Sequence, residues 1–327
     1  MSNLVQFAKV VSSLPGTLTP NTLYAVRVPN GFKFYITDIT GVAYPHQATN
    51  TVAYDFHRNK LINSSFAIAQ RIDCGLVVPV SNVVTLTAGQ YGHDRWKAGA
   101  NGCTYSYATV NNQTTITITA GSLQQVVLGS NLQSGSYYLS WTGTSVGSVG
   151  GSSTLGNSNY GANYGYSVTG GNNLTVEFGV GTLSKPQLET NTFSTASPYE
   201  VMESQEEFFR CLPYLQVTGA KAANKNFYIS TGFAFGATNA QFPMALLSPM
   251  IATPTVQYSN LQIAYNIGGG NNSAVSGPLP QGLSLINGMT NLTVTISAYL
   301  ATLPVGAHVM LNGVYSTNWY LALVSEL

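Results

Sequence analysis

The sequence predicts a mainly β protein, made of an N-terminal β-hairpin unit, a β-sandwich, a short connecting helix and a C-terminal β-sandwich module. Three observations predict this class. Short runs rich in Val, Ile, Thr, Tyr and Phe alternate between apolar and polar residues, and turns rich in Gly, Asn and Ser separate them. Only 7% of the residues are charged, against roughly 25% in average proteins. Since β-branched and aromatic residues remain abundant, this composition favours sheet over disorder.

Residues 1–45 are predicted to form the small hairpin unit. Residues 23–28 and 32–37 alternate, and Pro29-Asn30-Gly31 supplies a turn between them. Because a lone hairpin is marginally stable in water, we expect this unit to dock on another surface. Residues 46–58 are expected to be a linker in which His46 and His57 are solvated, since no third metal ligand lies near them.

Residues 59–197 are predicted to form one β-sandwich. In residues 115–119 the alternation is clean, with Ile facing inward and Thr outward. A Gly/Ser/Asn-rich insertion with three embedded tyrosines separates Trp141 from Leu174, and loops of this length are usually functional or disordered. The candidate strands are residues 66–69, 77–80, 83–87, 104–110, 114–119, 123–128, 137–142 and 174–180.

Residues 198–215 are predicted to form the connecting helix. Ser197 can cap it, Pro198 suits its first turn and Pro213 ends it. An apolar stripe through Phe209 and its neighbours is expected to have an acidic back. Residues 216–327 are predicted to form the C-terminal β module, with strands at residues 227–235, 255–267, 292–300, 307–311 and 319–324.

Charge and cysteine usage restrict the partners. The net charge of +1 gives no electrostatic reason to bind nucleic acid or anionic lipid. No run approaches the roughly 20 apolar residues of a membrane span, and the N-terminus does not resemble a signal peptide. The three cysteines lack metal-ligand spacing, so we expect buried or idle thiols and no metal or cofactor.

The acidic residues give little support for catalysis. Glycan cleavage commonly uses two carboxylates about 5–10 Å apart, and the sandwich offers four candidate acids. Asp94, beside Arg95, is interpreted as a structural ion pair or turn cap, and Glu177 as the outward residue of an alternating strand. We therefore expect no enzyme activity. The candidate acids are Asp73, Asp94, Glu177 and Glu189.

Two clusters of Asn and Tyr are candidate ligand-binding residues. Neutral glycans are held by polar hydrogen bonds and by sugar C–H faces against aromatic rings, and adaptable Asn/Tyr loops supply both. The first cluster could equally pack against a neighbouring subunit. Beside the second, Trp319 is assigned to the core, as are Trp96 and Trp141. The candidates are Asn157, Asn159, Tyr160, Asn163, Tyr164 and Tyr166 in the insertion, and Asn312, Tyr315 and Asn318 near the C-terminus.

The order of short motifs resembles bacteriophage tail-fibre or receptor-binding proteins over nearly the whole chain. Residues 14–32 are similar to the N-terminal hairpin module of such proteins, and residues 324–327 to their usual ending. Residues 59–66, 69–71 and 91–96 resemble the start of a jelly-roll module, and residues 187–189, 197–200 and 208–212 resemble its close. Two features depart from the pattern, namely the run Arg210-Cys211-Leu212-Pro213-Tyr214 and the tyrosine-rich insertion at residues 145–173.

The resemblance implies a jelly-roll at residues 59–197 similar to carbohydrate-binding modules, a homotrimer and recognition of the host surface. Residues 1–45 would attach to a phage tail or baseplate protein, and the partner outside would be a host glycan or protein. The expected location is the virion tail, reached from the host cytoplasm without a signal peptide. Two alternatives remain open: a purely structural virion protein, such as a head fibre or baseplate component, and a glycan depolymerase.

Overall fold

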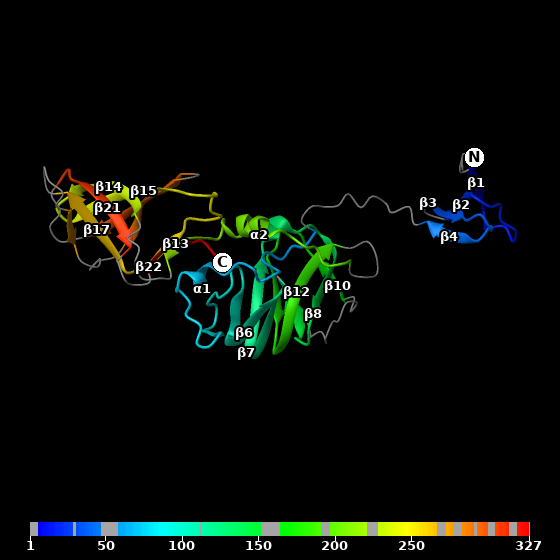
Figure 1. The fold of residues 1–327 in the computed structure, drawn as a ribbon, viewed down its shortest axis with the longest axis horizontal. Coiled ribbons are helices and arrows are strands. Elements are labelled where there is room, and N and C mark those ends of the chain that lie inside the picture. The colour runs from blue at the N-terminus through cyan, green and yellow to red at the C-terminus, as the bar shows by residue number, and fades with distance from the viewer. Residues whose placement is uncertain are drawn as a thin grey trace. The chain divides into compact units, whose positions relative to one another are not determined.

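The computed structural model shows a mainly β chain divided into two compact units, Met1–Arg58 and Asn59–Leu327 (Figure 1). It describes residues 6–28, 31–46, 58–111, 113–151, 164–190, 197–220, 228–266, 273–276, 283–290, 293–299, 305–313 and 319–326. Most of the predicted linker, residues 47–57, lies outside these ranges.

The first unit is a four-stranded sheet in the order β1-β2-β3-β4. The predicted hairpin is confirmed, because β2 (Thr22–Val28) pairs antiparallel with β3 (Gly31–Thr37). Two further strands were not predicted: β1 (Gln6–Val11), which runs parallel to β2, and β4 (Ala43–His46), which pairs with β3. The added strands give the hairpin the neighbours that it needs for stability.

The second unit begins with a β-sandwich around one hydrophobic core, which includes the predicted core residues Trp96 and Trp141. Its strand order is β10-β8-β12-β7-β11-β9, with β6 paired to β7 and β5 paired to β6. The elements are α1 (Gln70–Asp73), β5 (Val83–Leu86), β6 (Lys97–Val110), β7 (Gln113–Val127), the 3-10 helix η1 (Gly129–Asn131), β8 (Gly135–Thr142), β9 (Gly147–Val149), β10 (Tyr164–Val168), β11 (Leu174–Phe178) and β12 (Gly181–Thr190).

The long strand β7 lies between β12 and β11 in this order and pairs with both. The prediction of separate strands at residues 114–119 and 123–128 was wrong, because β7 is continuous through both. Its first half pairs with β12 and its second half with β11. The irregularity between the halves is at Gly121, whose φ is +68° and where a Cβ would clash with the carbonyl oxygen of Gly102. Glycine therefore lets β7 change partners without ending.

Two predicted strands before β5 are absent. Residues 66–69 lead into α1, and Phe66 has a positive φ of 54°. Residues 77–80 form only an isolated bridge from Val80 to Val83. Both segments are apolar because they cover the core, in which Phe66 and Val77 are buried, and not because they pair in a sheet.

The connecting helix is shorter than predicted and buries a different face. α2 spans Ser204–Cys211 and begins after Glu203, without a side-chain cap. The predicted cap, Ser197, instead contacts Glu189. Glu207 and Cys211 face inward, whereas the Phe209 side chain is 53% exposed. Part of the acidic side that was predicted to form the back of the helix is therefore buried.

The C-terminal module is a second β-sandwich built from a three-stranded and a seven-stranded sheet. Trp319, confirmed as a core residue, packs with Phe242 and Ile263 in a cluster that joins the two sheets. The first sheet has the order β13 (Leu215–Ala220), β22 (Trp319–Val324), β16 (Thr255–Ser259). The second has the order β18 (Ser273–Ser276), β17 (Leu261–Asn266), β21 (His308–Gly313), β14 (Tyr228–Gly236), β15 (Asn239–Ala245), β20 (Thr293–Tyr299), β19 (Leu283–Thr290).

The predicted strand at residues 255–267 divides between these sheets. β16 belongs to the three-stranded sheet and β17 to the seven-stranded sheet. Asn260 between them has a φ of 50°, the left-handed conformation in which Asn is common. An alternating pattern alone does not indicate such a corner.

Candidate functional site

Several segments of the second unit that are far apart in the sequence meet in one buried network, here called the junction network. It lies where the first sandwich, α2 and the C-terminal end of the chain come together. Its members are Asn59, Asn63, Gln70, Arg71, Asp94, Arg95, Glu200, Glu207, Ser325 and Glu326.

Asn59 ties the start of the sandwich to β12. Its Oδ1 accepts hydrogen bonds from the backbone N–H groups of Leu61 and Leu188, both at 3.0 Å. Its Nδ2 donates to the Pro186 carbonyl oxygen at 3.0 Å, and its backbone N–H donates to Glu200 Oε2 at 2.7 Å. An amide that makes this many buried bonds fixes the backbone around it.

Asn63 fixes the next stretch of backbone in a similar way. Its Nδ2 donates to the Ile68 and Asp94 carbonyl oxygens, at 2.8 and 2.9 Å. Its backbone N–H donates to Glu207 Oε2 at 2.6 Å, which explains why α2 turns an acidic residue inward. Trp96 Nε1 donates to the Asn63 carbonyl oxygen at 2.9 Å. The two asparagine side chains, four residues apart, thus fix the backbone at the start of the sandwich.

The penultimate residue of the chain closes the network. Glu326 Oε2 lies 2.7 Å from Arg71 Nη2, with side chains only 1% and 4% exposed. The backbone N–H of Arg95 donates to Glu326 Oε1 at 3.3 Å, and the Arg95 guanidinium lies 3.5 Å from the ring centre of Tyr214. The neighbouring Ser325 Oγ donates to the Pro213 carbonyl oxygen at 2.8 Å. These contacts join the C-terminal module to the first sandwich.

Burial perturbs the titration of two adjacent residues in opposite ways. Loss of hydration raises the pKa of Asp94 from 3.8 to about 7, although the nearby Gln70 and Arg71 oppose the rise. The same loss lowers the pKa of His93 from 6.5 to about 4. Burial also raises the pKa of Glu207 and of Glu326. The sequence interpretation of Asp94 as a turn cap fits its contacts, because its Oδ1 accepts the backbone N–H of Gln70 at 2.9 Å, at the start of α1.

The other candidate acids also have structural contacts. Glu189 is buried and accepts the backbone N–H of Ser197 at 2.8 Å. Glu177 accepts a hydrogen bond from the Ser122 hydroxyl and faces away from the buried Val176, as predicted. Asp73 is exposed at the end of α1. Asp94, Glu177 and Glu189 thus serve as hydrogen-bond acceptors within the scaffold.

The structure places three of the predicted ligand-binding residues. Tyr164 and Tyr166 lie in β10, which pairs with β8, and Tyr166 packs against the core of the first sandwich. Asn312 lies in β21 and is only 6% exposed, so its side chain belongs to the interior of the C-terminal module. The remaining candidates, Asn157, Asn159, Tyr160, Asn163, Tyr315 and Asn318, lie outside the described residues.

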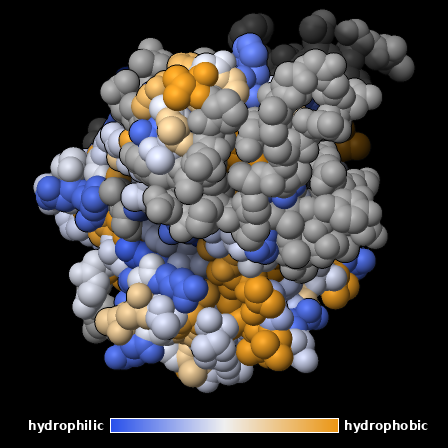
Figure 2. Space-filling view, turned by 90° about the vertical axis from the view of Figure 1, so that its left-hand side faces the viewer, coloured by the Kyte–Doolittle hydropathy of each residue, from blue (hydrophilic) through white to orange (hydrophobic). Residues whose placement is uncertain are grey.

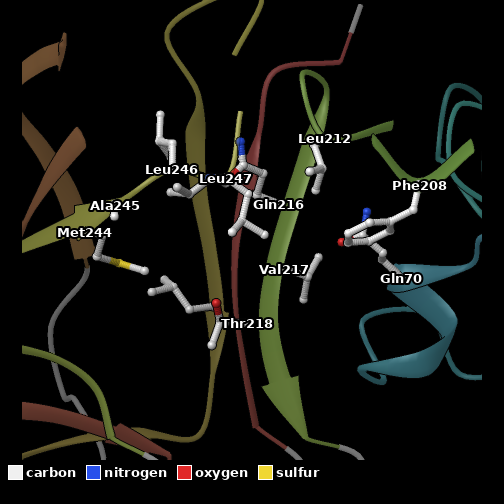
Figure 3. Close-up of a pocket in the computed structure, with 12 residues that line it drawn as sticks. Gln70, Phe208, Leu212, Gln216, Val217, Thr218, Met244, Ala245, Leu246 and Leu247 are labelled. Carbon is white, nitrogen blue, oxygen red and sulfur yellow. The ribbon is translucent and has the colours of Figure 1, made fainter. Parts of the chain in front are cut away.

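A small cavity lies beside α2 and β13 (Figure 3). Its volume is about 60 Å³, whereas pockets for small molecules measure roughly 300–1,000 Å³. Phe208 of α2, Leu212 directly after α2, Val217 of β13 and Met244 of β15 line it, together with the polar Gln70. We interpret this cavity as imperfect packing between α2 and the C-terminal module.

Exposed aromatic residues on β14 form a different candidate site, which the sequence reasoning missed. Phe233 and Phe235 are 49% and 44% exposed, while Ala234 between them is buried. Figure 2 shows that hydrophobic residues reach the surface in separate groups among hydrophilic ones. The signal was available in Gly-Phe-Ala-Phe-Gly, where the small central residue marks the inward face and the two rings the outward face.

No protein-family model matches the chain, and no curated protein matches it either. Among the described residues, no group of three or more His, Cys, Asp or Glu side chains could hold a metal ion. Within the same ranges of the chain, no helix has the length and apolar character needed to cross a membrane.

Proposed function

We propose that this protein is a non-catalytic adhesion protein of a bacteriophage virion, a tail fibre or receptor-binding protein that attaches to a host-surface glycan or other receptor. In this proposal residues 1–45 attach to the tail or baseplate, and the two sandwiches of the second unit face outward. The protein would act as a homo-oligomer, with a homotrimer as the expected state.

The junction network is the observation that carries the proposal. Segments of the second unit that resemble the tail-fibre pattern are far apart in the sequence, yet they contact one another. The backbone N–H of Asn59 donates to Glu200, the Arg71 side chain pairs with Glu326, and the backbone N–H of Asn63 donates to Glu207, next to the motif at residues 208–212. Such contacts between distant segments support one shared architecture for these motifs.

The use of the carboxylates supports an adhesive role over a hydrolytic one. Asp94, Glu189 and Glu207 are buried and accept backbone N–H groups, and Glu326 is paired with Arg71. A hydrolase would need an acid free to exchange protons with substrate. These four side chains are instead committed to holding the scaffold together.

The test is adsorption of the purified full chain to host bacteria. The chain is expected to bind cells, to compete with infection by the phage, and to release no reducing ends from the host polysaccharide. A Tyr164→Ala variant tests the predicted insertion site in the same assay, with Tyr166 retained because it packs against the core of the first sandwich. Failure of the wild-type chain both to bind cells and to slow infection would overturn the proposal and favour the structural virion protein. New reducing ends would favour the depolymerase.

A further inference from the structure

The outward face of β14 has the features of a binding surface. Phe233 and Phe235 are both exposed on either side of the buried Ala234, and the register with β15 shifts between Ala234 and Gly236, next to Phe235. Ala234 between them is anchored to the segment before β21, because its N–H donates to the Ala307 carbonyl oxygen at 2.9 Å and its carbonyl oxygen accepts the N–H of Gly306 at 2.7 Å. The two half-exposed rings are therefore held by a fixed backbone.

Polar side chains flank the Phe233 ring at known positions in the sheet. His308 of β21 lies directly opposite Phe233 on one side, and Gln241 of β15 lies opposite it on the other. His308 is exposed and Gln241 is half-buried. Cross-strand partners in an antiparallel pair stand on the same face, so an imidazole and an amide lie on either side of the phenyl ring. Both can donate and accept hydrogen bonds.

The charge of the surrounding sequence selects the kind of ligand. Between Lys225 and Glu326 the chain contains no Asp, Glu, Lys or Arg, and Glu326 is neutralised by Arg71. An acidic or basic ligand would lose hydration here and gain no opposite charge. A neutral ligand carries no charge to desolvate. Its apolar face matches the rings, and its hydroxyl groups match the flanking polar side chains.

We infer that the β14 face, defined as Phe233, Phe235, Gln241 and His308, binds an uncharged glycan chain. The C–H faces of neighbouring sugar units pack on the two rings, and their hydroxyl groups bond to Gln241 and His308. This inference rests on the proposed adhesive function and gives it a second site besides the insertion at residues 145–173.

The experiment uses the full chain and affinity electrophoresis in gels that contain uncharged bacterial polysaccharide, with a charged polysaccharide as the comparison. The wild-type chain is expected to be retarded by the uncharged polymer only. A Phe233→Ala/Phe235→Ala variant should bind at least about tenfold more weakly, as expected for the loss of two ring contacts. Phe209→Ala is the matched control, because Phe209 is a similarly exposed phenylalanine on α2; it should not alter binding.

A Phe233→Tyr/Phe235→Tyr variant guards against a folding defect, since it keeps the rings and is expected to keep the binding. Equal retardation of the wild type and the alanine variant would overturn the inference while leaving the adhesive function intact. So would host-cell binding without binding to any uncharged polysaccharide. If light scattering shows that the alanine variant has a smaller mass in solution, with unchanged glycan binding, the face is an interface between copies and the inference is wrong. Absence of both cell and glycan binding by the wild type would refute the proposed function itself.

Discussion

Replacing Asp94 by Asn should change how the stability of the second unit depends on pH. Burial raises the pKa of this carboxyl to about 7, so the folded state holds a proton there that the unfolded state, with a pKa of 3.8, has already released. Stability from Asp94 is therefore greatest in acid and is lost as the pH rises from about 4 to 7. The difference between the two pKa values corresponds to roughly 4 kcal/mol at about 1.4 kcal/mol per pH unit.

His93 works in the opposite direction over nearly the same range. Its pKa is lowered from 6.5 to about 4, so the unfolded state holds the extra proton. The stability that neutral His93 contributes is present above pH 6.5 and is lost as the pH falls toward 4, by roughly 3 kcal/mol. Between about pH 4 and 6.5 the folded and unfolded states therefore bind nearly equal numbers of protons at these two residues, and their effects cancel.

Removing either residue should reveal the effect of the other. Asn at position 94 can still accept the Gln70 N–H, so the variant keeps the turn but no longer titrates. Its free energy of unfolding, relative to wild type, should rise with pH by about 1.4 kcal/mol per unit over this window. His93→Gln should show the reverse slope.

Urea unfolding between pH 4.5 and 7.5, followed by tryptophan fluorescence, measures these slopes. All three tryptophans lie in the second unit, at positions 96, 141 and 319. Only differences from wild type are compared, so other titrating groups cancel. If both variants give curves parallel to the wild-type curve, Asp94 is ionised and His93 is not held neutral, and the reasoning from burial is refuted.

Three further predictions concern the scaffold. Glu326→Ala should lower the free energy of unfolding by about 3–5 kcal/mol, because it leaves buried arginine charge uncompensated, while the exposed Glu203→Ala should change it by less than about 0.5 kcal/mol; equal effects in a urea titration would contradict the role of the ion pair. Gly121→Ala should lower the free energy of unfolding by more than about 2 kcal/mol, since the new Cβ would meet a carbonyl oxygen. Gly89 has a similar positive φ but no atom within 4 Å of such a Cβ, so Gly89→Ala should cost only about 1 kcal/mol. Similar melting temperatures for the two variants would show that the contact at position 121 is relieved. Cys211, whose pKa burial raises well above the usual value, should resist alkylation in the native protein and react rapidly in urea, and rapid native labelling followed by mass spectrometry would show that α2 opens.

The sequence alone determined the class of structure, because alternation is a local property. The Ile/Thr alternation in β7 and the pattern of β14 could be recognised without any knowledge of their neighbours. The burial of Trp96, Trp141 and Trp319 also followed from size and apolar character.

Only the tertiary structure decided which faces and partners these elements take. The acidic residues of α2 were predicted to form its back, yet Glu207 is buried, because Asn63 from a distant segment of the chain offers a backbone N–H to that carboxylate. Likewise β7 continues through position 121 because that residue is a glycine, which avoids a clash with the Gly102 carbonyl oxygen of the neighbouring strand. Neither cause is visible within a short window of sequence.

The candidate sites divide in the same way. Composition indicated neutral, aromatic and amide-rich surfaces, and this follows from residue types alone. The placement of Asn312 inside the C-terminal module, and of Phe233 between His308 and Gln241 on its surface, depends on strand register. A shift of one residue in the pairing moves every side chain of a strand to the opposite face of the sheet. The register is set by pairing in three dimensions, and it decides which residues can contact a ligand.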